Sequence, residues 1–142
     1  MREVEVAFID SNVLIYTQSL DEPEKRITAL QLLDNHVKVC ISTQVLNEVS
    51  SVLIRKKTVP LIDVRSFVST LIELCLVIPV TDACILRAFD LMEKYGFSYY
   101  DSMILASALK AQCTILYSED MSDGLLVEGQ LRIVNPFRKA VR

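Results

Sequence analysis

Apolar residues follow two different spacings along the chain, and stretches of the two kinds alternate. Short runs rich in β-branched residues predict strands, whereas longer stretches with apolar residues three and four positions apart predict helices. The expected strands cover residues 4–9, 37–42, 76–80, 113–118 and 131–134. The expected helices cover residues 12–20, 22–36, 43–57, 61–74, 82–95 and 98–111.

The order of these elements indicates an α/β fold. Strands alternate with helices, and several strands are apolar on both faces, which is typical of a parallel sheet covered by helices on both sides. The chain has 3 glycines and 4 prolines, which favours long helices and short loops over a β-sandwich. Because 51% of the 142 residues are hydrophobic and no repeat or linker is visible, residues 1–142 are expected to form one domain.

The charge pattern limits the partners that the chain can attract. A formal net charge of −3 provides no overall positive field for nucleic acid, so any phosphate-binding surface must be local. The basic clusters are Arg55–Lys56–Lys57 and residues 137–142, which are also explained as a solvated helix end and a chain terminus. The N-terminus carries charges where a signal peptide needs an apolar stretch, and no apolar run is long enough to span a bilayer. We therefore expect a soluble protein without membrane contact.

The cysteine pattern predicts a reducing compartment. The chain has 4 cysteines, none in a C-x-x-C pair and each among apolar neighbours, which is typical of buried thiols in a cytoplasmic protein. His36 is the only histidine and is expected in a surface loop, so a zinc site is not expected. The cysteines are Cys40, Cys75, Cys84 and Cys113.

Carboxylates recur where the strands of the expected sheet end. In a parallel sheet with right-handed crossovers, the carboxyl ends of the strands and the N-termini of the following helices lie along one edge, where ligands bind. Asp10 directly follows the first strand, and Asp101 lies in the first turn of the helix that begins at Ser98. Glu48 lies about one and a half turns into the helix after the second strand, at the border of its apolar face. The strand at 113–118 is followed by Glu119, Asp120 and Asp123.

Each of these acids also has a purely structural explanation. Asp10 can cap a helix, and Ser98-x-x-Asp101 matches a capping box with Asp in the place of the usual Glu or Gln. Asp120 and Asp123 can be turn residues, and Glu48 can be the solvated flank of its helix.

Together, the acids indicate a metal site. Four separate segments each bring a carboxylate to one edge, and no Lys or Arg is adjacent in sequence to Asp10, Glu48, Asp101 or Asp120. Close carboxylates repel each other unless a cation compensates them, and an all-oxygen cluster suits Mg²⁺ or Mn²⁺. One or two such ions can hydrolyse a phosphodiester bond. No P-loop, G-x-G-x-x-G or Ser–His pair offers a competing mechanism.

Four segments, "FIDSNVLIY", "TQVLNEV", "YYDSMILASAL" and "LYSEDMSDG", resemble the PIN domain and, more closely, VapC-type toxins of toxin–antitoxin pairs. The resemblance implies a three-layer α/β/α sandwich with a mainly parallel sheet and a Mg²⁺- or Mn²⁺-dependent ribonuclease that leaves 5′-phosphate and 3′-hydroxyl ends. It also implies an RNA substrate, a homodimer and a cognate antitoxin protein. By motif, the four catalytic and metal-binding acids are Asp10, Glu48, Asp101 and Asp120.

The resemblance also suggests supporting residues. Asn12 matches a small polar residue that supports the first acid, and Ser118 matches a Ser or Thr that hydrogen-bonds a carboxylate. Asp123 falls where some members have an additional polar residue, and Glu119 is not assigned to the metal.

Three other functions compete with this one. A receiver-type phosphoacceptor needs an early acidic pair and a late lysine, which are absent, and a haloacid dehalogenase needs an Asp where Asn12 stands. Both are disfavoured. A catalytically silent PIN domain that binds RNA or protein is the open alternative, because activity depends on fine placement of the carboxylates.

Overall fold

The computed structural model describes residues 5–35 and 38–138. Its centre is a six-stranded sheet in the order β3-β2-β1-β4-β6-β5. The strands are β1 (Val6–Ile9), β2 (Lys38–Ser42), β3 (Leu76–Ile78), β4 (Ile115–Tyr117), β5 (Leu126–Val127) and β6 (Leu131–Val134). The helices are α1 (Ser11–Tyr16), α2 (Pro23–Asn35), α3 (Thr43–Lys56), α4 (Leu61–Leu74), α5 (Asp82–Tyr95) and α6 (Tyr99–Lys110).

The sheet is parallel except at one edge. All neighbouring strands from β3 to β6 pair in parallel, whereas β5 pairs antiparallel with β6. The chain moves outward from β1 through β2 to β3 and then returns to β4 on the other side of β1. Strand order therefore reverses between β1 and β4, which is the position where open α/β sheets bind ligands.

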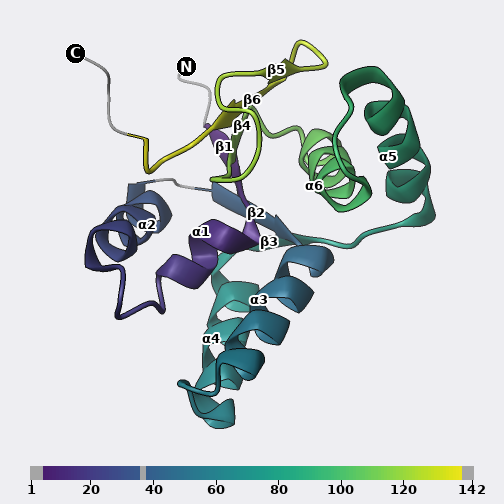
Figure 1. The fold of residues 1–142 in the computed structure, drawn as a ribbon. Helices are drawn as coiled ribbons and strands as arrows, with labels where there is room; N and C mark the ends of the chain where they lie inside the picture. The colour runs from purple at the N-terminus through teal and green to yellow at the C-terminus, as the bar shows by residue number, and fades with distance from the viewer. Residues whose placement is uncertain (1–4, 36–37, 139–142) are drawn as a thin grey trace.

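Helices cover both sides of the sheet, which confirms the expected α/β sandwich. Figure 1 shows α5 and α6 side by side on one side and α1 and α2 on the other. The α3–α4 pair extends away from β2 and β3 (Figure 1). None of the helices in the described part of the chain is long and apolar enough to cross a bilayer.

The core lies around β1 and α6. Ala7, Phe8 and Ile9 of β1 are fully buried, and all residues of α6 from Ser102 to Leu109 are buried. Because burial of one large apolar side chain such as Leu105 contributes about 1.5–3 kcal/mol, α6 is a main source of stability. This burial explains why the α6 sequence is apolar on nearly every face.

The predicted helix ends are confirmed where the signals are local. Thr81 caps α5 through its side chain, and Gly96 ends α5 with a left-handed φ of 78°. Ser98 caps α6, and α4 has the bounds that the pattern predicts. The expected burial of the cysteines is confirmed for Cys40, Cys84 and Cys113, whereas Cys75 is half-buried.

Other expected bounds are wrong. The helix expected at 12–20 ends at Tyr16, because the hydroxyls of Thr17 and Ser19 donate to the carbonyls of Leu14 and Ile15 and so compete with the helical pattern. The strand expected at 76–80 ends at Ile78, since Pro79 has no amide hydrogen for the ladder.

Differences also occur near the C-terminal strands. The strand expected at 113–118 is shortened to Ile115–Tyr117, and β5 is not predicted because two residues show no periodicity. The expectations for Val4, His36, Val37 and residues 139–142 lie outside the described residues.

Candidate active site

Asp10 lies where β1 ends and α1 begins. Its backbone amide donates to the Tyr117 carbonyl at 3.0 Å and so extends the pairing of β1 with β4. The Asp10 side chain, which is 5% exposed, accepts hydrogen bonds from the Ser11 amide at 2.7 Å and from the Ser118 hydroxyl at 2.8 Å. Asp10 is therefore both the cap of α1 and a buried carboxylate at the switch point of the sheet.

The surroundings of Asp10 disfavour its charge. Burial, together with the charges of Glu48 and Asp101, raises the pKa of Asp10 from 3.8 to about 6. The hydrogen bonds from Ser118 and Ser11 act in the opposite direction and offset only part of this effect. A buried carboxylate whose pKa is raised by burial and by neighbouring acids is a candidate for binding a cation.

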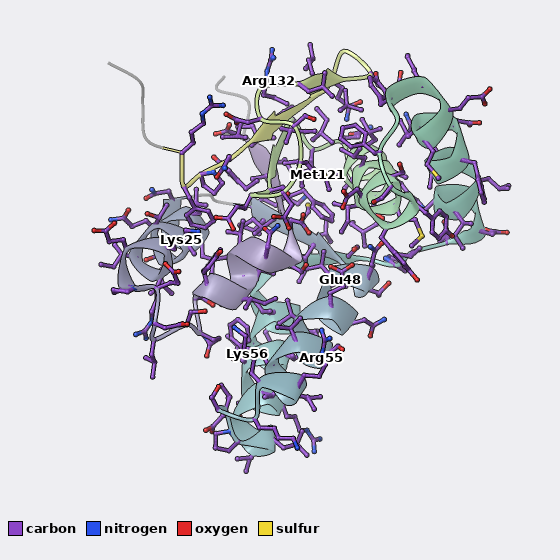
Figure 2. The ribbon with its side chains drawn as sticks, viewed as in Figure 1. Lys25, Glu48, Arg55, Lys56, Met121 and Arg132 are labelled. Atoms are coloured by element: carbon purple, nitrogen blue, oxygen red, sulfur yellow. The ribbon has the colours of Figure 1, made fainter. Side chains whose placement is uncertain are left out.

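Glu48 reaches the site from the second turn of α3. One carboxylate oxygen accepts from the Ser11 hydroxyl at 2.5 Å, and the other accepts from the amide nitrogen of Gln44 at 2.9 Å. The same Ser11 hydroxyl lies 3.4 Å from Asp10 Oδ1, so it connects the two acids. Figure 2 shows Glu48 at the end of α3 that faces α1 and α6. The inward placement expected for Glu48 is thus observed.

Asp101 lies in the first turn of α6, as expected. Its amide donates to the Ser98 hydroxyl at 3.2 Å, which forms one half of the capping box. Burial raises the pKa of Asp101, the Ser98 hydrogen bond lowers it, and the charges of Asp120 and Glu48 raise it. The helix N-terminus provides the favourable partial charge that allows a carboxylate there.

Asp120 lies in the loop after β4. Its carboxylate accepts from the side-chain amide of Asn12 at 3.0 Å, and the carbonyl of that side chain accepts from the Glu119 amide at 3.4 Å. The next residue, Met121, is 6% exposed and anchors the loop in the core (Figure 2). The carboxylate that Asn12 contacts is therefore Asp120, whereas hydroxyls and a backbone amide hold Asp10.

The four acids share one electrostatic environment. Their charges act on one another, and within the described part of the chain every hydrogen-bond donor to their carboxylates is a neutral hydroxyl or amide. No Lys or Arg among residues 5–35 and 38–138 forms an ion pair with any of them. The same residues contain no group of three or more acids, His or Cys close enough to form a complete metal centre.

The donor set nevertheless fits a hard cation. It consists of carboxylate oxygens, which are the ligand type that Mg²⁺ and Mn²⁺ prefer. The buried negative charge has no protein cation to balance it within the described residues.

Two neighbouring acids, Asp123 and Glu119, pair with cationic side chains outside the acid cluster. Asp123 accepts from the Asn135 amide at 2.8 Å and pairs with Arg138 at 3.0 Å, and these contacts hold its pKa below the usual range. Glu119 pairs with Lys25 at 2.7 Å and accepts from the Tyr16 hydroxyl at 2.6 Å. Burial raises the pKa of Glu119, but the two hydrogen bonds outweigh burial and hold it low.

Sequence reasoning missed two residues that hold the site together. Ser11 links Asp10 with Glu48. The Gln44 amide donates both to Glu48 and to the Tyr100 carbonyl at 3.1 Å, and so connects α3 with the first turn of α6. The spacing of four residues places Gln44 and Glu48 on one helix face, which is a usable signal. The contact with residue 100 depends on tertiary structure alone.

Several solved structures that share this fold are toxins or toxin–antitoxin complexes. A toxin–antitoxin complex from Klebsiella pneumoniae superposes with a TM-score of 0.70 at 22% identity, covering 94% of this chain and 99% of that chain. VapC20 of Mycobacterium tuberculosis, a sarcin–ricin loop cleaving toxin, has a TM-score of 0.64 at 20% identity, covering 80% and 89%. VapBC2 from Rickettsia felis, bound to a promoter DNA fragment, has a TM-score of 0.59 at 17% identity, covering 81% and 88%.

Comparison of the sequence with individual proteins and comparison with protein families give different results. No curated protein sequence matches this one. Residues 7–122, which contain all four acids, match the PIN domain family. Because this match extends over most of the sequence and agrees with the observed fold, the chain belongs to the PIN domain family.

Proposed function

We propose that this protein is a divalent-metal-dependent ribonuclease and the toxin of a type II toxin–antitoxin pair. The observation that carries the proposal is the convergence of Asp10, Glu48, Asp101 and Asp120 from four segments, with neutral donors as their only described hydrogen-bond partners. Family membership supports nuclease chemistry. The fold shared with VapC20, a sarcin–ricin loop cleaving toxin, supports RNA as the substrate.

Asp10, Glu48 and Asp101 are proposed to hold the principal ion, and Asp120 to complete the cluster directly or through water. When bound, Mg²⁺ or Mn²⁺ supplies positive charge to the phosphate oxygens and acidifies water for attack on phosphorus. Attack in line would leave 5′-phosphate and 3′-hydroxyl ends.

The remaining residues of the site are proposed to orient these ligands. Ser118 and the Ser11 amide hold opposite oxygens of Asp10, so its carboxylate has a defined direction. Gln44 and Ser11 do the same for Glu48. Partners of this kind fix the ligands before the metal arrives, which lowers the cost of ordering them.

Metal binding tests the proposal directly. Wild-type protein is titrated with Mn²⁺ beside Asp101→Asn, after circular dichroism has shown that both are folded. Saturable binding by the wild type and its loss in Asp101→Asn is the expected result, together with loss of RNA cleavage. Asp90→Asn, an exposed acid on α5, is the matched control and retains both properties. Equal Mn²⁺ binding or equal cleavage by Asp101→Asn would contradict the proposal.

We also propose a cognate antitoxin, a homodimer and a cytoplasmic location. Structures of toxin–antitoxin complexes share the fold, and large apolar side chains are exposed on α4, including Leu61 at 70% and Ile62 at 73%. All four cysteines are free thiols, which agrees with a reducing compartment. Analytical ultracentrifugation of the purified chain tests the dimer, and co-purification with the product of an adjacent small gene tests the antitoxin.

A catalytically silent PIN domain is the alternative. The presence of all four acids, with their supporting hydrogen bonds, favours the enzyme. Specific RNA binding without cleavage in Mg²⁺ and Mn²⁺ by folded wild-type protein would favour the silent module.

A further inference from the structure

Cys84 lies in the first turn of α5, the helix that runs beside α6 (Figure 1). It is a free thiol and is 3% exposed. Its backbone amide donates to the hydroxyl of Thr81, the N-cap of α5, at 3.4 Å. The first turn of a helix has unpaired amides and a partial positive charge, which favour an anion. A buried cysteine is nevertheless often only a small apolar side chain, so the groups around its sulfur decide whether it reacts.

The Thr81 hydroxyl is directed at the sulfur of Cys84. Its oxygen lies 3.5 Å from Cys84 Sγ and also accepts from the Lys110 ammonium at 3.4 Å. A hydroxyl oxygen has two acceptor positions and one proton. Because the Cys84 amide and the Lys110 ammonium can only donate, they fill both acceptor positions, and the hydroxyl proton is left for the sulfur. Thr81 therefore connects the charge of Lys110 with Cys84.

A second hydroxyl faces the same sulfur from α6. Ser107 is 0% exposed, and within the described residues its hydroxyl oxygen has no hydrogen-bond partner of full geometry. The hydroxyl lies close enough to Cys84 to lower the pKa of that thiol. A buried polar group without a partner lowers stability, so such groups in folded proteins often mark a functional site. The Ser107 hydroxyl is available to a negative charge on the sulfur, or to an oxygen bound to it.

The surroundings of Cys84 favour its thiolate. Burial raises the pKa of the Cys84 thiol, but the hydrogen bonds of its neighbours and the charge of Lys110 together outweigh burial and hold the pKa below its usual range. Asp82, an acid in the same turn, is exposed, and its carboxylate accepts from the Ala83 amide at 2.9 Å. Cys84 therefore ionises more readily than an ordinary cysteine, although it lies between two helices.

The other three cysteines differ from Cys84. Burial raises the pKa of Cys75 to about 11, and donation of its proton to Cys40 raises that of Cys113. The hydrogen bond from the Cys113 thiol lowers the pKa of Cys40 to about 7, but both residues are 0% exposed. Cys84 thus combines a lowered pKa with a position that is not fully enclosed.

We propose that Cys84 is a modification site at which hydrogen peroxide oxidises the thiol to a sulfenic acid. The ionised sulfur attacks one peroxide oxygen, so that an S–O bond forms and the O–O bond breaks. The leaving hydroxide takes up the proton that the thiol released and departs as water, and the sulfur loses two electrons to the peroxide. The hydroxyls of Thr81 and Ser107 are placed to bond the new oxygen. Because Cys84 is nearly enclosed, a small peroxide suits the site better than a bulky disulfide.

Trapping of the sulfenic acid tests the proposal. The folded protein is treated with hydrogen peroxide and dimedone in EDTA, and fragment-ion mass spectrometry locates the dimedone label. Cys84 should be labelled before the other three cysteines. Ser107→Ala should slow this labelling by about 10-fold, because a hydrogen bond to an anion is strong. Ser102→Ala is the matched control and should react as the wild type does, since Ser102 is also a fully buried serine of α6 whose hydroxyl has no described partner.

A surface variant tests the same site without changing the core. Lys110→Gln alters an exposed side chain and should slow labelling of Cys84 by about 2- to 5-fold, as expected for the loss of one exposed charge. Lys56→Gln, an exposed lysine in the last turn of α3, is its matched control and should leave the rate unchanged. Lys110→Gln also decides the question if Ser107→Ala fails to fold, which circular dichroism shows.

Three results would overturn the proposal. Labelling of another cysteine before Cys84 would show that its neighbours do not activate it, and equal rates in Ser107→Ala and Ser102→Ala, or in Lys110→Gln and Lys56→Gln, would show the same. Labelling of Cys84 only in urea would show a packed thiol that reacts after unfolding. The label is read as a mass, so the result is independent of metal binding and of the proposed nuclease function.

Discussion

Two kinds of carboxylate lie side by side in the loop after β4. Glu119 pairs with Lys25, and Asp123 pairs with Arg138, whereas Asp120 between them has only the neutral amide of Asn12 as its described hydrogen-bond partner. Residue type and position in the loop are nearly the same for all three acids. The difference lies in the partners that the fold brings to each side chain.

The same contrast extends over the molecule. The pKa values of Glu119 and Asp123 are held low by cations and hydrogen bonds, whereas burial and neighbouring acids raise those of Asp10 and Asp101. Carboxylates with cationic partners stabilise the fold, and carboxylates gathered without them lower stability in the absence of metal. The contrast supports the proposal that the acids without cationic partners serve function, and four experiments test it.

The largest expected effect is on catalysis. Asp10→Asn should reduce RNA cleavage by about 10³-fold, because loss of a proposed metal ligand removes several kcal/mol of transition-state stabilisation. Asp123→Asn makes the same chemical change in a carboxylate that pairs with Arg138, and it should retain cleavage within a few-fold. Rates on one RNA at saturating Mn²⁺ check both variants, and comparable losses in the two would remove the distinction between the two kinds of acid.

The next effect concerns the neutral partners of the cluster. Gln44→Ala should weaken Mn²⁺ binding by about 10–100-fold, since its amide orients Glu48 and holds the first turn of α6. Gln130→Ala is the matched control, because that amide also donates to backbone carbonyls but lies away from the acids. Isothermal titration with Mn²⁺ measures both, and unchanged affinity in Gln44→Ala would mean that Glu48 needs no support.

A third test uses pH. The pKa of Asp10 is raised from 3.8 to about 6 on folding, so the folded state binds this proton more tightly than the unfolded state. The group therefore contributes most to stability below pH 4, and that contribution is lost as pH rises from about 4 to about 6. The change corresponds to at most about 3 kcal/mol. Urea unfolding of metal-free protein should show the loss in wild type but not in Asp10→Asn, and parallel pH profiles would contradict it.

The smallest effect is on thermal stability. In EDTA, Glu119→Gln should lower the unfolding midpoint by about 1–3 °C, because it weakens the partly exposed pair with Lys25. Asp120→Asn, in the same loop, should leave the midpoint unchanged or raise it, since it removes repulsion on Asp101. Differential scanning calorimetry distinguishes the two variants, and a lower midpoint for Asp120→Asn would show that its charge stabilises the metal-free fold.

Local signals explain which elements could be predicted from sequence. The α4 bounds follow from Pro60 and an unbroken apolar period, and the ends of α5 follow from Thr81 and Gly96. Each of these signals acts within a few residues of the bond that it forms. The end of α1 was missed because Thr17 and Ser19 compete for helical carbonyls, which apolar spacing does not report.

The candidate acids could be predicted because strand order and crossover handedness place chain segments along one edge. Position after a strand was enough to select Asp10, and position in the first turn of a helix was enough to select Asp101. Three acids follow β4, and only the family motif distinguished Asp120 from Glu119 and Asp123. Support of Asp10 by Asn12 stays a prediction, and the described contact of the Asn12 amide is with Asp120. Position along the chain does not determine where a side-chain amide points.

The sequence by itself determined the alternation of strands and helices, the burial of α6 and the four segments that carry the acids. Only the tertiary structure decided that Gln44 joins α3 to α6 and that Lys25 and Arg138 neutralise Glu119 and Asp123. The physical reason is the separation along the chain of the residues that each interaction joins. Periodicity and capping act between neighbours in the chain, whereas hydrogen bonds and ion pairs depend on distances of about 3 Å between segments that folding brings together.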